Sequence, residues 1–238
     1  MASGRRSWLV SVVRRIKRDE AFDLDPAIRP FDFLSIVLRR MVMGFRGLGL
    51  ALRAGRAAVP VFVGRGVVVT NARHLNLAPG VSIGDYCRLD CLGSSGVTLG
   101  RGSTLRRGVH VEVTSVLRSV GVGLMVGERV GISEGCYIGA KGGVDIGSDT
   151  IIGPGCRLIA EEHIFERADE TVRSQGVSRS GISVGRDCWL GSGVTVLDGT
   201  TIEDGCVVGA GAVVTRSLPE FSVAYGVPAR VARARRMT

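Results

Sequence analysis

The sequence predicts an all-β solenoid, a parallel β-helix of about six coils with an N-terminal helical segment and a short C-terminal tail. Between residues 77 and 214 a Leu, Ile or Val recurs at steps of six, and Gly follows nine of these eighteen residues. Aromatic residues make up only 5% of the 238-residue chain, whereas Gly occurs 35 times. A short period with few large rings is typical of a thin repeat protein and not of a globular sandwich.

The six-residue steps group in threes, which predicts a three-sided coil of eighteen residues. The recurring residue and the one four positions later are both small or aliphatic, so we expect both to point inward. A short strand followed by a tight turn satisfies this spacing, and Gly accepts the turn conformations. The recurring residues are Leu77, Ile83, Leu89, Leu99, Leu105, Val111, Val126, Ile132, Ile138, Ile146, Ile152, Leu158, Val184, Leu190, Val196, Ile202, Val208 and Val214.

Four interruptions of the period fall at the same point of the coil. Extra residues stand at 95–98, 117–125, 144–145 and 164–183, each time after a complete set of three rungs. All four insertions should therefore leave the solenoid at one corner. Binding residues concentrate in loops that a rigid scaffold presents, so we expect the functional site along this edge, above all at the longest insertion, residues 164–183.

Three segments differ in composition. Residues 1–66 hold thirteen Lys and Arg against five Asp and Glu, a net charge of +8, whereas residues 67–238 have eighteen against seventeen, a net charge of +1. We assign residues 1–66 to a basic helical segment, 67–216 to the β-helix with its loop at 164–183, and 217–238 to a basic tail. Amphipathic helices are predicted at residues 7–18 and 34–56, the second with Arg39, Arg46 and Arg53 seven apart.

The basic helical segment has two interpretations, which the sequence leaves open. It could lie on an anionic membrane surface, or it could cap the open first coil. No motif typical of nucleic-acid binding accompanies the charge, so we expect no nucleic-acid partner. Neither a secretory signal nor a membrane-spanning run is recognisable. We expect a cytoplasmic protein, whose peripheral contact, if residues 1–66 make one, is with the inner face of the cytoplasmic membrane.

Five of the six cysteines occupy one position of the period. They follow a recurring residue by four, where other repeats carry Val, Thr or Ala, and so read as small inward-facing side chains. They are Cys87, Cys136, Cys156, Cys188 and Cys206; Cys91 stands off that position. Without a CxxC pair we expect no metal site.

His163 is the histidine whose position points to chemistry. It closes a rung, opens the twenty-residue insertion and stands beside Glu161 and Glu162, either of which could orient an imidazole. His74 lies in a turn-like stretch before the first full coil. His110 and His163 end different rungs and should point to different corners, which argues against a three-histidine metal site.

A series of short motifs follows His163 in a fixed order. The motifs are Glu162-His163-Ile164-Phe165, Gln175-Gly176, the run from Gly181 to Gly191 with Trp189, the run from Val208 to Arg216, and the run from Ala224 to Val231. This series resembles the hexapeptide-repeat acetyltransferases of the maltose and galactoside acetyltransferase type. With Glu112-Val113-Thr114 and the basic N-terminal segment, the longer pattern is similar to acetyltransferases of bacterial capsule, exopolysaccharide and lipopolysaccharide clusters. The resemblance covers about residues 60–235.

The resemblance implies a left-handed coil, a homotrimer and acetyl-CoA bound between neighbouring subunits. It assigns His163 as general base, with Glu162 in the preceding place where the family usually has Asn or Asp. The backbone N–H of Ser192 corresponds to the donor to the acetyl oxygen. Three positions fall beside the acceptor, namely Phe165, Gln175 and Trp189. Six fall along coenzyme A, namely Ala210, Gly211, Thr215 and Arg216 at the pantetheine arm and Arg230 and Arg233 at the nucleotide end.

These residue types suit acetyl transfer to a saccharide hydroxyl. A hydroxyl is a poor nucleophile at neutral pH, and a histidine with an ordinary pKa of about 6.5 can take its proton during attack on the thioester. A fixed backbone N–H stabilises the negative charge that develops on the former carbonyl oxygen. We therefore expect an acetyl-CoA-dependent O-acetyltransferase of cell-surface polysaccharide biosynthesis. The alternatives are an N-acetyltransferase on an amino sugar and a catalytically silent trimeric scaffold.

Overall fold

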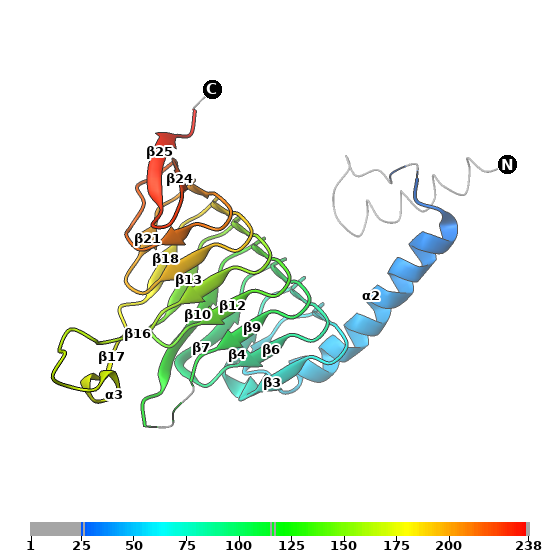
Figure 1. Ribbon diagram of the computed structural model, residues 1–238. Coiled ribbons are helices and arrows are strands. Elements are labelled where there is room, and N and C mark those ends of the chain that lie inside the picture. The colour runs from blue at the N-terminus through cyan, green and yellow to red at the C-terminus, as the bar shows by residue number, and fades with distance from the viewer. Residues whose placement is uncertain (1–24, 26, 115, 117, 237–238) are drawn as a thin grey trace. The chain divides into compact units, whose positions relative to one another are not determined.

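The structure is a computed structural model that describes residue 25 and residues 27–114, 116 and 118–236. Short strands stack in three parallel sheets, which form the three sides of a β-helix (Figure 1). We call these sheets A, B and C. The chain passes through them in that repeating order, so each coil contributes one strand to each sheet. The predicted left-handed parallel β-helix is confirmed.

The strand bounds show how short each rung is. Sheet A contains β1 (Arg56–Ala57), β4 (Leu75–Leu77), β7 (Gly93–Leu99), β10 (Gly121–Val126), β13 (Val144–Ile146), β18 (Ile182–Val184) and β21 (Thr201–Ile202). Sheet B contains β2 (Phe62–Val63), β5 (Ser82–Ile83), β8 (Thr104–Leu105), β11 (Gly131–Ile132), β14 (Ile151–Ile152), β19 (Trp189–Leu190), β22 (Val207–Val208), β24 (Ser222–Tyr225) and β25 (Arg230–Ala234). Sheet C contains β3 (Val68–Thr70), β6 (Arg88–Asp90), β9 (His110–Glu112), β12 (Tyr137–Gly139), β15 (Arg157–Ile159), β20 (Thr195–Leu197) and β23 (Val213–Val214).

The core consists of the residues that the six-residue period singles out. All eighteen recurring residues are buried, each no more than 4% exposed. The six cysteines are free and buried as well, and burial raises the pKa of the Cys91 thiol to about 12. They therefore fill space inside the coils, as predicted for five of them.

The β-helix begins one coil earlier than the sequence analysis places it. Strands β1 and β2 pair in parallel with β4 and β5, so seven coils are present and the boundary at residue 66 falls inside the first. The first coil is hard to recognise because Ala57 stands where every later coil has Leu, Ile or Val. Val63 and Val69 then continue the period.

The C-terminal segment also joins the solenoid. Strand β24 runs parallel to β22 as one more strand of sheet B, and β25 returns antiparallel to β24. Residues 222–234 therefore end the sheet with a short hairpin. The arginines predicted to meet coenzyme A lie on this hairpin, with Arg230 opposite Tyr225 and Arg233 opposite Val223.

The insertions leave between sheets C and A, at what we call the C-to-A corner. The insertions at residues 95–98 and 117–125 do not form two separate loops. They extend β7 and β10, which are the longest strands of sheet A and pair along most of their length. The second connects β9 to β10, and the largest lies between β15 and β18 (Figure 1). The opposite turns from sheet B to sheet C, the B-to-C corner, carry no insertion.

Helix α2 (Pro30–Ala51) precedes the first coil, beginning four residues before the predicted helix and ending five before its predicted end. Proline is favourable in the first helical turn because its missing N–H is unused there. The contacts divide the chain into two units, Met1–Val42 and Met43–Thr238. In the second unit Gly47 lies so close to the Val61 carbonyl that a Cβ would come within 1.9 Å of the oxygen. The predicted helix at residues 7–18 lies outside the described residues.

None of the helices in the described part of the chain is long and apolar enough to cross a membrane.

Candidate active site

The largest insertion is an ordered excursion that begins at His163. Strand β16 (Glu162–His163) pairs antiparallel with β17 (Val177–Ser178), which places His163 opposite Val177. The N–H of Ile164 donates to the Gly176 carbonyl at 3.1 Å. Helix α3 (Val172–Gln175) is capped by the Thr171 hydroxyl, which accepts from Ser174 N–H. The imidazole therefore stands at the root of a two-stranded ribbon and is exposed.

Gln175 holds the tip of this excursion together. Its Oε1 accepts from the N–H of Arg167 at 3.0 Å, and its Nε2 donates to the Arg167 carbonyl at 2.8 Å. This amide clamp explains why Gln suits the position without reference to a substrate. Phe165, the other predicted acceptor contact on the excursion, is 61% exposed, so its ring is available to a partner or ligand.

Asp198 fixes the point where the excursion returns to the coil. Its carboxylate accepts from the N–H of Ser180 at 2.8 Å and 3.0 Å and from the N–H of Gly181 at 2.8 Å. Asp198 was not singled out from the sequence. Its position in the repeat could have predicted this role. Asp198 is an acidic residue directly after β20, on the coil that follows the longest insertion.

A half-buried ion-pair cluster lies beside the root of the excursion. Glu161 accepts from Lys141 Nζ at 2.8 Å and pairs with Arg179 at 2.7 Å, and Arg179 also donates to the Ser119 hydroxyl at 2.6 Å. Burial disfavours the charged carboxyl, but the hydrogen bonds and charges of Lys141 and Arg179 outweigh it and lower the pKa of Glu161. The cluster ties together the second and the largest insertion.

Tyr137 and Glu112 extend the cluster along sheet C. The Tyr137 hydroxyl donates to Glu112 at 3.1 Å, and Lys141 Nζ lies 3.8 Å from the same carboxylate. Burial, together with the negative charge of Glu112, raises the pKa of Tyr137 to about 12. The ring of His110 meets that of Tyr137 edge-on at 5.4 Å, so His110 belongs to this face of the coil and not to the excursion.

Neither Glu161 nor Glu162 forms a hydrogen bond with His163 within the described part of the chain. Glu161 is already engaged by Lys141 and Arg179. Glu162 is the neighbour of His163 on strand β16, and successive side chains of a strand point to opposite sides. The structure therefore does not bring Glu162 to the imidazole, and its part in catalysis stays a prediction.

The B-to-C corner presents backbone donors on its last two full coils. Ser192 follows β19 and Ala210 follows β22, and the coils stack so that Gly211 N–H donates to the Ser192 carbonyl at 2.8 Å. The flanking glycines Gly191 and Gly193 use their N–H groups in bonds to the coils above and below. Among the described turn hydrogen bonds, none uses the N–H of Ser192 or Ala210, and both residues are exposed. These two N–H groups are available to a ligand.

The remaining predicted positions are spread over the C-terminal coils. Trp189 lies on the outer face of sheet B between Ile151 and Val207 and is 55% exposed. Thr215 and Arg216 follow β23 on the C-to-A corner, above the excursion. Arg230 and Arg233 lie on exposed β25.

The predicted catalytic groups therefore lie at two different corners. His163 leaves the coil after a strand of sheet C, whereas Ser192 stands before the next strand of that sheet. The three-residue strand between two corners alone spans about 10 Å. Within one chain, the imidazole and the Ser192 N–H cannot act on the same atom. They can do so only where the C-to-A corner of one copy meets the B-to-C corner of another.

Comparison with protein families identifies the repeat. Residues 181–216 match the family described as bacterial transferase hexapeptide (six repeats). A probable acetyltransferase of Mycobacterium tuberculosis, Rv3034c, is 31% identical over 132 residues, which is 56% of this chain and 44% of that protein. The chain thus spans less than half of that relative. The putative lipopolysaccharide biosynthesis O-acetyl transferase WbbJ of Escherichia coli is 29% identical over 151 residues, 60% of this chain and 76% of that protein.

A solved structure supports the fold. A point mutant of AntD, an N-acyltransferase from Bacillus cereus in complex with dTDP-4-amino-4,6-dideoxyglucose and coenzyme A, superposes with a TM-score of 0.52 at 15% identity. The match covers 74% of this chain and 82% of that one. The resemblance to hexapeptide-repeat acetyltransferases that the sequence suggested is confirmed.

Proposed function

We propose that this hexapeptide-repeat protein is an acetyltransferase that moves the acetyl group of acetyl-CoA to a saccharide hydroxyl, with His163 as general base. Two observations carry the proposal: the exposed His163 imidazole at the C-to-A corner, and the two backbone N–H groups at the B-to-C corner that none of the described turn hydrogen bonds uses. The names of the Mycobacterium and Escherichia relatives support the acetyl donor and, for WbbJ, the O-acetyl product.

The geometry suits the two charges that acyl transfer must manage. The His163 imidazole takes the proton of the attacking hydroxyl, which typically contributes about 10²–10⁴-fold to the rate. The oxygen of the thioester carbonyl becomes negative as the new C–O bond forms, and the Ser192 N–H donates to it. As the tetrahedral intermediate breaks down, the C–S bond breaks and the imidazolium returns its proton to the departing thiolate.

The site requires more than one copy of the chain. Because the base and the N–H donor lie at different corners, we propose a homotrimer with active sites at the subunit interfaces. Ala210, Gly211, Thr215 and Arg216 would follow the pantetheine arm, while the exposed guanidinium groups of Arg230 and Arg233 suit the phosphates of the nucleotide end. Phe165 and Trp189, both more than half exposed, would line the acceptor side.

Replacing His163 by Ala tests the proposal. We expect release of coenzyme A in the presence of saccharide acceptors to fall by about 10²–10⁴-fold, while coenzyme A binding by calorimetry and the oligomeric state stay unchanged. Arg173→Ala, on the exposed side of the same excursion, is the matched control. Undiminished turnover in the His163 variant contradicts the assignment, and absence of coenzyme A binding by the parent protein favours a silent scaffold.

The acceptor class is tested by product chemistry. We propose a hydroxyl acceptor within a cell-surface polysaccharide precursor, supported by the name of WbbJ. Maltose offers only hydroxyl groups, whereas glucosamine also offers an amine. An acetyl ester is cleaved by hydroxylamine and an acetyl amide is not. A hydroxylamine-resistant product formed from glucosamine, with none from maltose, would assign the protein as an N-acetyltransferase instead.

A further inference from the structure

Helix α2 has one face packed against the first coil and another that faces away. In the unit that begins at Met43, the packed face contains Met43 and Leu50, which are 8% and 6% exposed. Phe45 and Leu48 point the other way and are 70% and 51% exposed, and Leu52, directly after the helix end, is 89% exposed. A helix that only capped the solenoid would need the first face and not the second.

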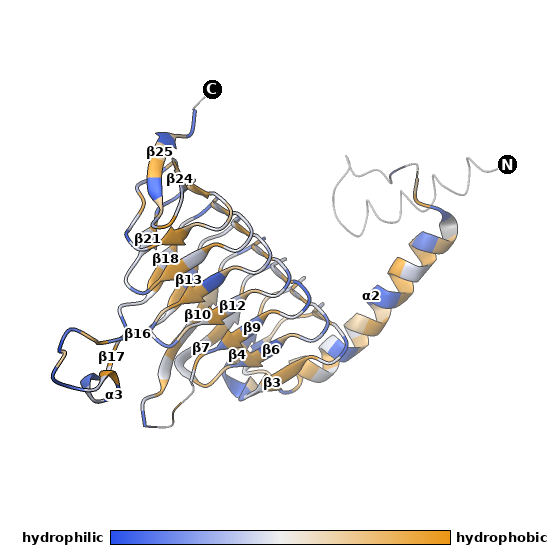
Figure 2. Ribbon diagram, viewed as in Figure 1, coloured by the Kyte–Doolittle hydropathy of each residue, from blue (hydrophilic) through white to orange (hydrophobic). Residues whose placement is uncertain are grey.

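The part of α2 that belongs to the unit ending at Val42 also exposes apolar side chains. Leu34, Leu38 and Met41 are each about half exposed, at 51%, 53% and 54%. They are spaced by four and three residues, which is the spacing of one helical face. Figure 2 shows the apolar stretches of α2 interrupted by hydrophilic residues. Residues 27–58 contain six Arg and one acidic residue, Asp32, so α2 together with its flanking residues is cationic.

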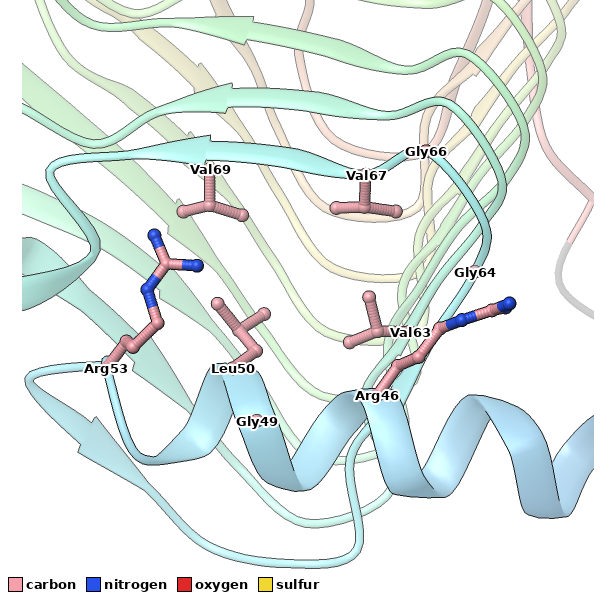
Figure 3. A pocket seen from close by; sticks show the side chains of 9 residues that line it. All are labelled: Arg46, Gly49, Leu50, Arg53, Val63, Gly64, Gly66, Val67 and Val69. Carbon is pink, nitrogen blue, oxygen red and sulfur yellow. The ribbon is translucent and has the colours of Figure 1, made fainter.

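A cavity of about 360 Å³ lies between the end of α2 and the first coil. Its apolar wall consists of Leu50 from the helix and Val63, Val67 and Val69 from the coil, where Val67 and Val69 point toward the helix (Figure 3). Arg46 and Arg53 also line it. The volume is in the range of small-molecule pockets, about 300–1,000 Å³.

The two arginines lining the cavity have no counter-charge among the described residues. Across the described residues no hydrogen bond or ion pair involves Arg46 or Arg53 side chains, whereas the exposed Arg129 pairs with both Glu128 and Asp149. A guanidinium binds phosphate oxygens through two parallel N–H donors. A pocket with one aliphatic wall and two such groups in its lining is complementary to a molecule with an acyl chain and a phosphate.

We propose that this cavity binds the phosphate and upper acyl chain of one anionic phospholipid, and that the exposed face of α2 lies in the bilayer surface beside it. The apolar face supplies area for insertion at the headgroup boundary, and the arginines supply attraction to anionic lipid. The proposal does not depend on acetyl transfer, because each test below measures binding.

Vesicle sedimentation of the full chain tests the charged part. We expect binding to vesicles of phosphatidylcholine with phosphatidylglycerol and little binding to phosphatidylcholine alone. Each arginine near an anionic surface raises the membrane partition coefficient about 5-fold. The double substitution Arg46→Ala with Arg53→Ala should therefore weaken vesicle binding about 25-fold. Arg101→Ala with Arg157→Ala, two exposed arginines elsewhere on the solenoid, removes the same charge and is the matched control. Equal losses in both double variants overturn a specific site.

Filling the cavity tests the lipid pocket separately from the charge. Val67→Phe should abolish calorimetric binding of a soluble short-chain phosphatidylglycerol while the oligomeric state and the thermal unfolding are retained. Inorganic phosphate distinguishes a free-anion site: if it binds as tightly as the short-chain lipid, the acyl part of the proposal is wrong. If Phe45→Gln and Leu52→Gln change the oligomeric state and leave vesicle binding intact, the face contacts a second copy and the proposal fails.

Discussion

The C-to-A and B-to-C corners of the β-helix are built from the same six-residue repeat but present different chemical groups. The C-to-A corner carries the insertions, and its side chains are tied by ion pairs such as those of Glu161. The B-to-C corner has tight turns of small residues, with backbone N–H groups of Ser192 and Ala210 left unused. In the proposed reaction, the first corner provides the imidazole that accepts a proton and the second provides a fixed backbone N–H donor. The difference teaches that, under the proposed function, one chain holds the base and the N–H donor at separate corners, which is why the proposal requires a second copy.

Removing the donor at the B-to-C corner should have an effect second only to that of His163→Ala. Pro154 occupies the turn position one coil below Ser192, as shown by the bond from Gly193 N–H to its carbonyl at 2.9 Å. The turn therefore accepts Pro, and Ser192→Pro deletes the N–H without breaking the coil. We expect kcat to fall about 10²–10³-fold. Glu134→Pro, at the same corner two coils below, should leave kcat unchanged.

Mixed assemblies sharpen the same comparison. His163→Ala and Ser192→Pro chains, each nearly inactive alone, should regain activity when refolded or coexpressed together. With random mixing about a quarter of the interfaces combine an intact His163 with an intact Ser192, so activity should approach about a quarter of the parent value. No recovery in mixed trimers, confirmed by native mass spectrometry, would place both groups in one chain's site.

Loosening the root of the excursion should have a smaller effect. Asp198→Ala leaves the N–H groups of Ser180 and Gly181 without their carboxylate, a local cost of about 1–3 kcal/mol. We expect faster amide hydrogen exchange at residues 176–181 and a lower kcat with little change in global Tm. Asp198→Asn keeps one acceptor oxygen, so its exchange rate and its kcat should lie between those of the parent protein and those of Asp198→Ala. Unchanged exchange would show that the excursion is held by other contacts.

The smallest effect concerns the pH dependence of stability. Because the pKa of Glu161 is lowered in the folded chain, its ion pairs stabilise the protein above the unfolded pKa of about 4.3, and this contribution is lost as pH falls through the folded value. Glu161→Gln should therefore be about 1–3 kcal/mol less stable near neutral pH, with the difference shrinking in acid. Urea unfolding at several pH values measures it; a constant difference contradicts the ion-pair origin.

The repeat was readable from the sequence because burial inside a thin coil allows few residue types. The eighteen aliphatic residues and the four interruptions predicted the sheets and the loop-bearing corner. The first coil does not follow the period at Ala57, where a small side chain takes the place of Leu, Ile or Val. Asp198 escaped notice because its partners are backbone N–H groups seventeen and eighteen residues away, and backbone donors leave no pattern in a sequence.

For the candidate site, residue identity was predictable and relative position only in part. His163 could be placed at its corner by counting rungs. That Gln175 clamps the excursion, and that Glu161 is engaged by Lys141 and Arg179, depends on how the insertions fold on one another. The period stops at each insertion, so it carries no information about those contacts.

Each coil adds the same rise, so the position of a residue along the axis of the solenoid follows from the number of its coil. Successive strands of a sheet are about 4.8 Å apart, and the excursion leaves four coils after the one that α2 covers, so the imidazole stands about 20 Å along the axis from that end. If the α2 end rests on a bilayer with the coil axis perpendicular to it, this length fixes how far above the surface an acceptor group must reach. Deleting one eighteen-residue coil would lower the imidazole by about 5 Å with its chemistry untouched.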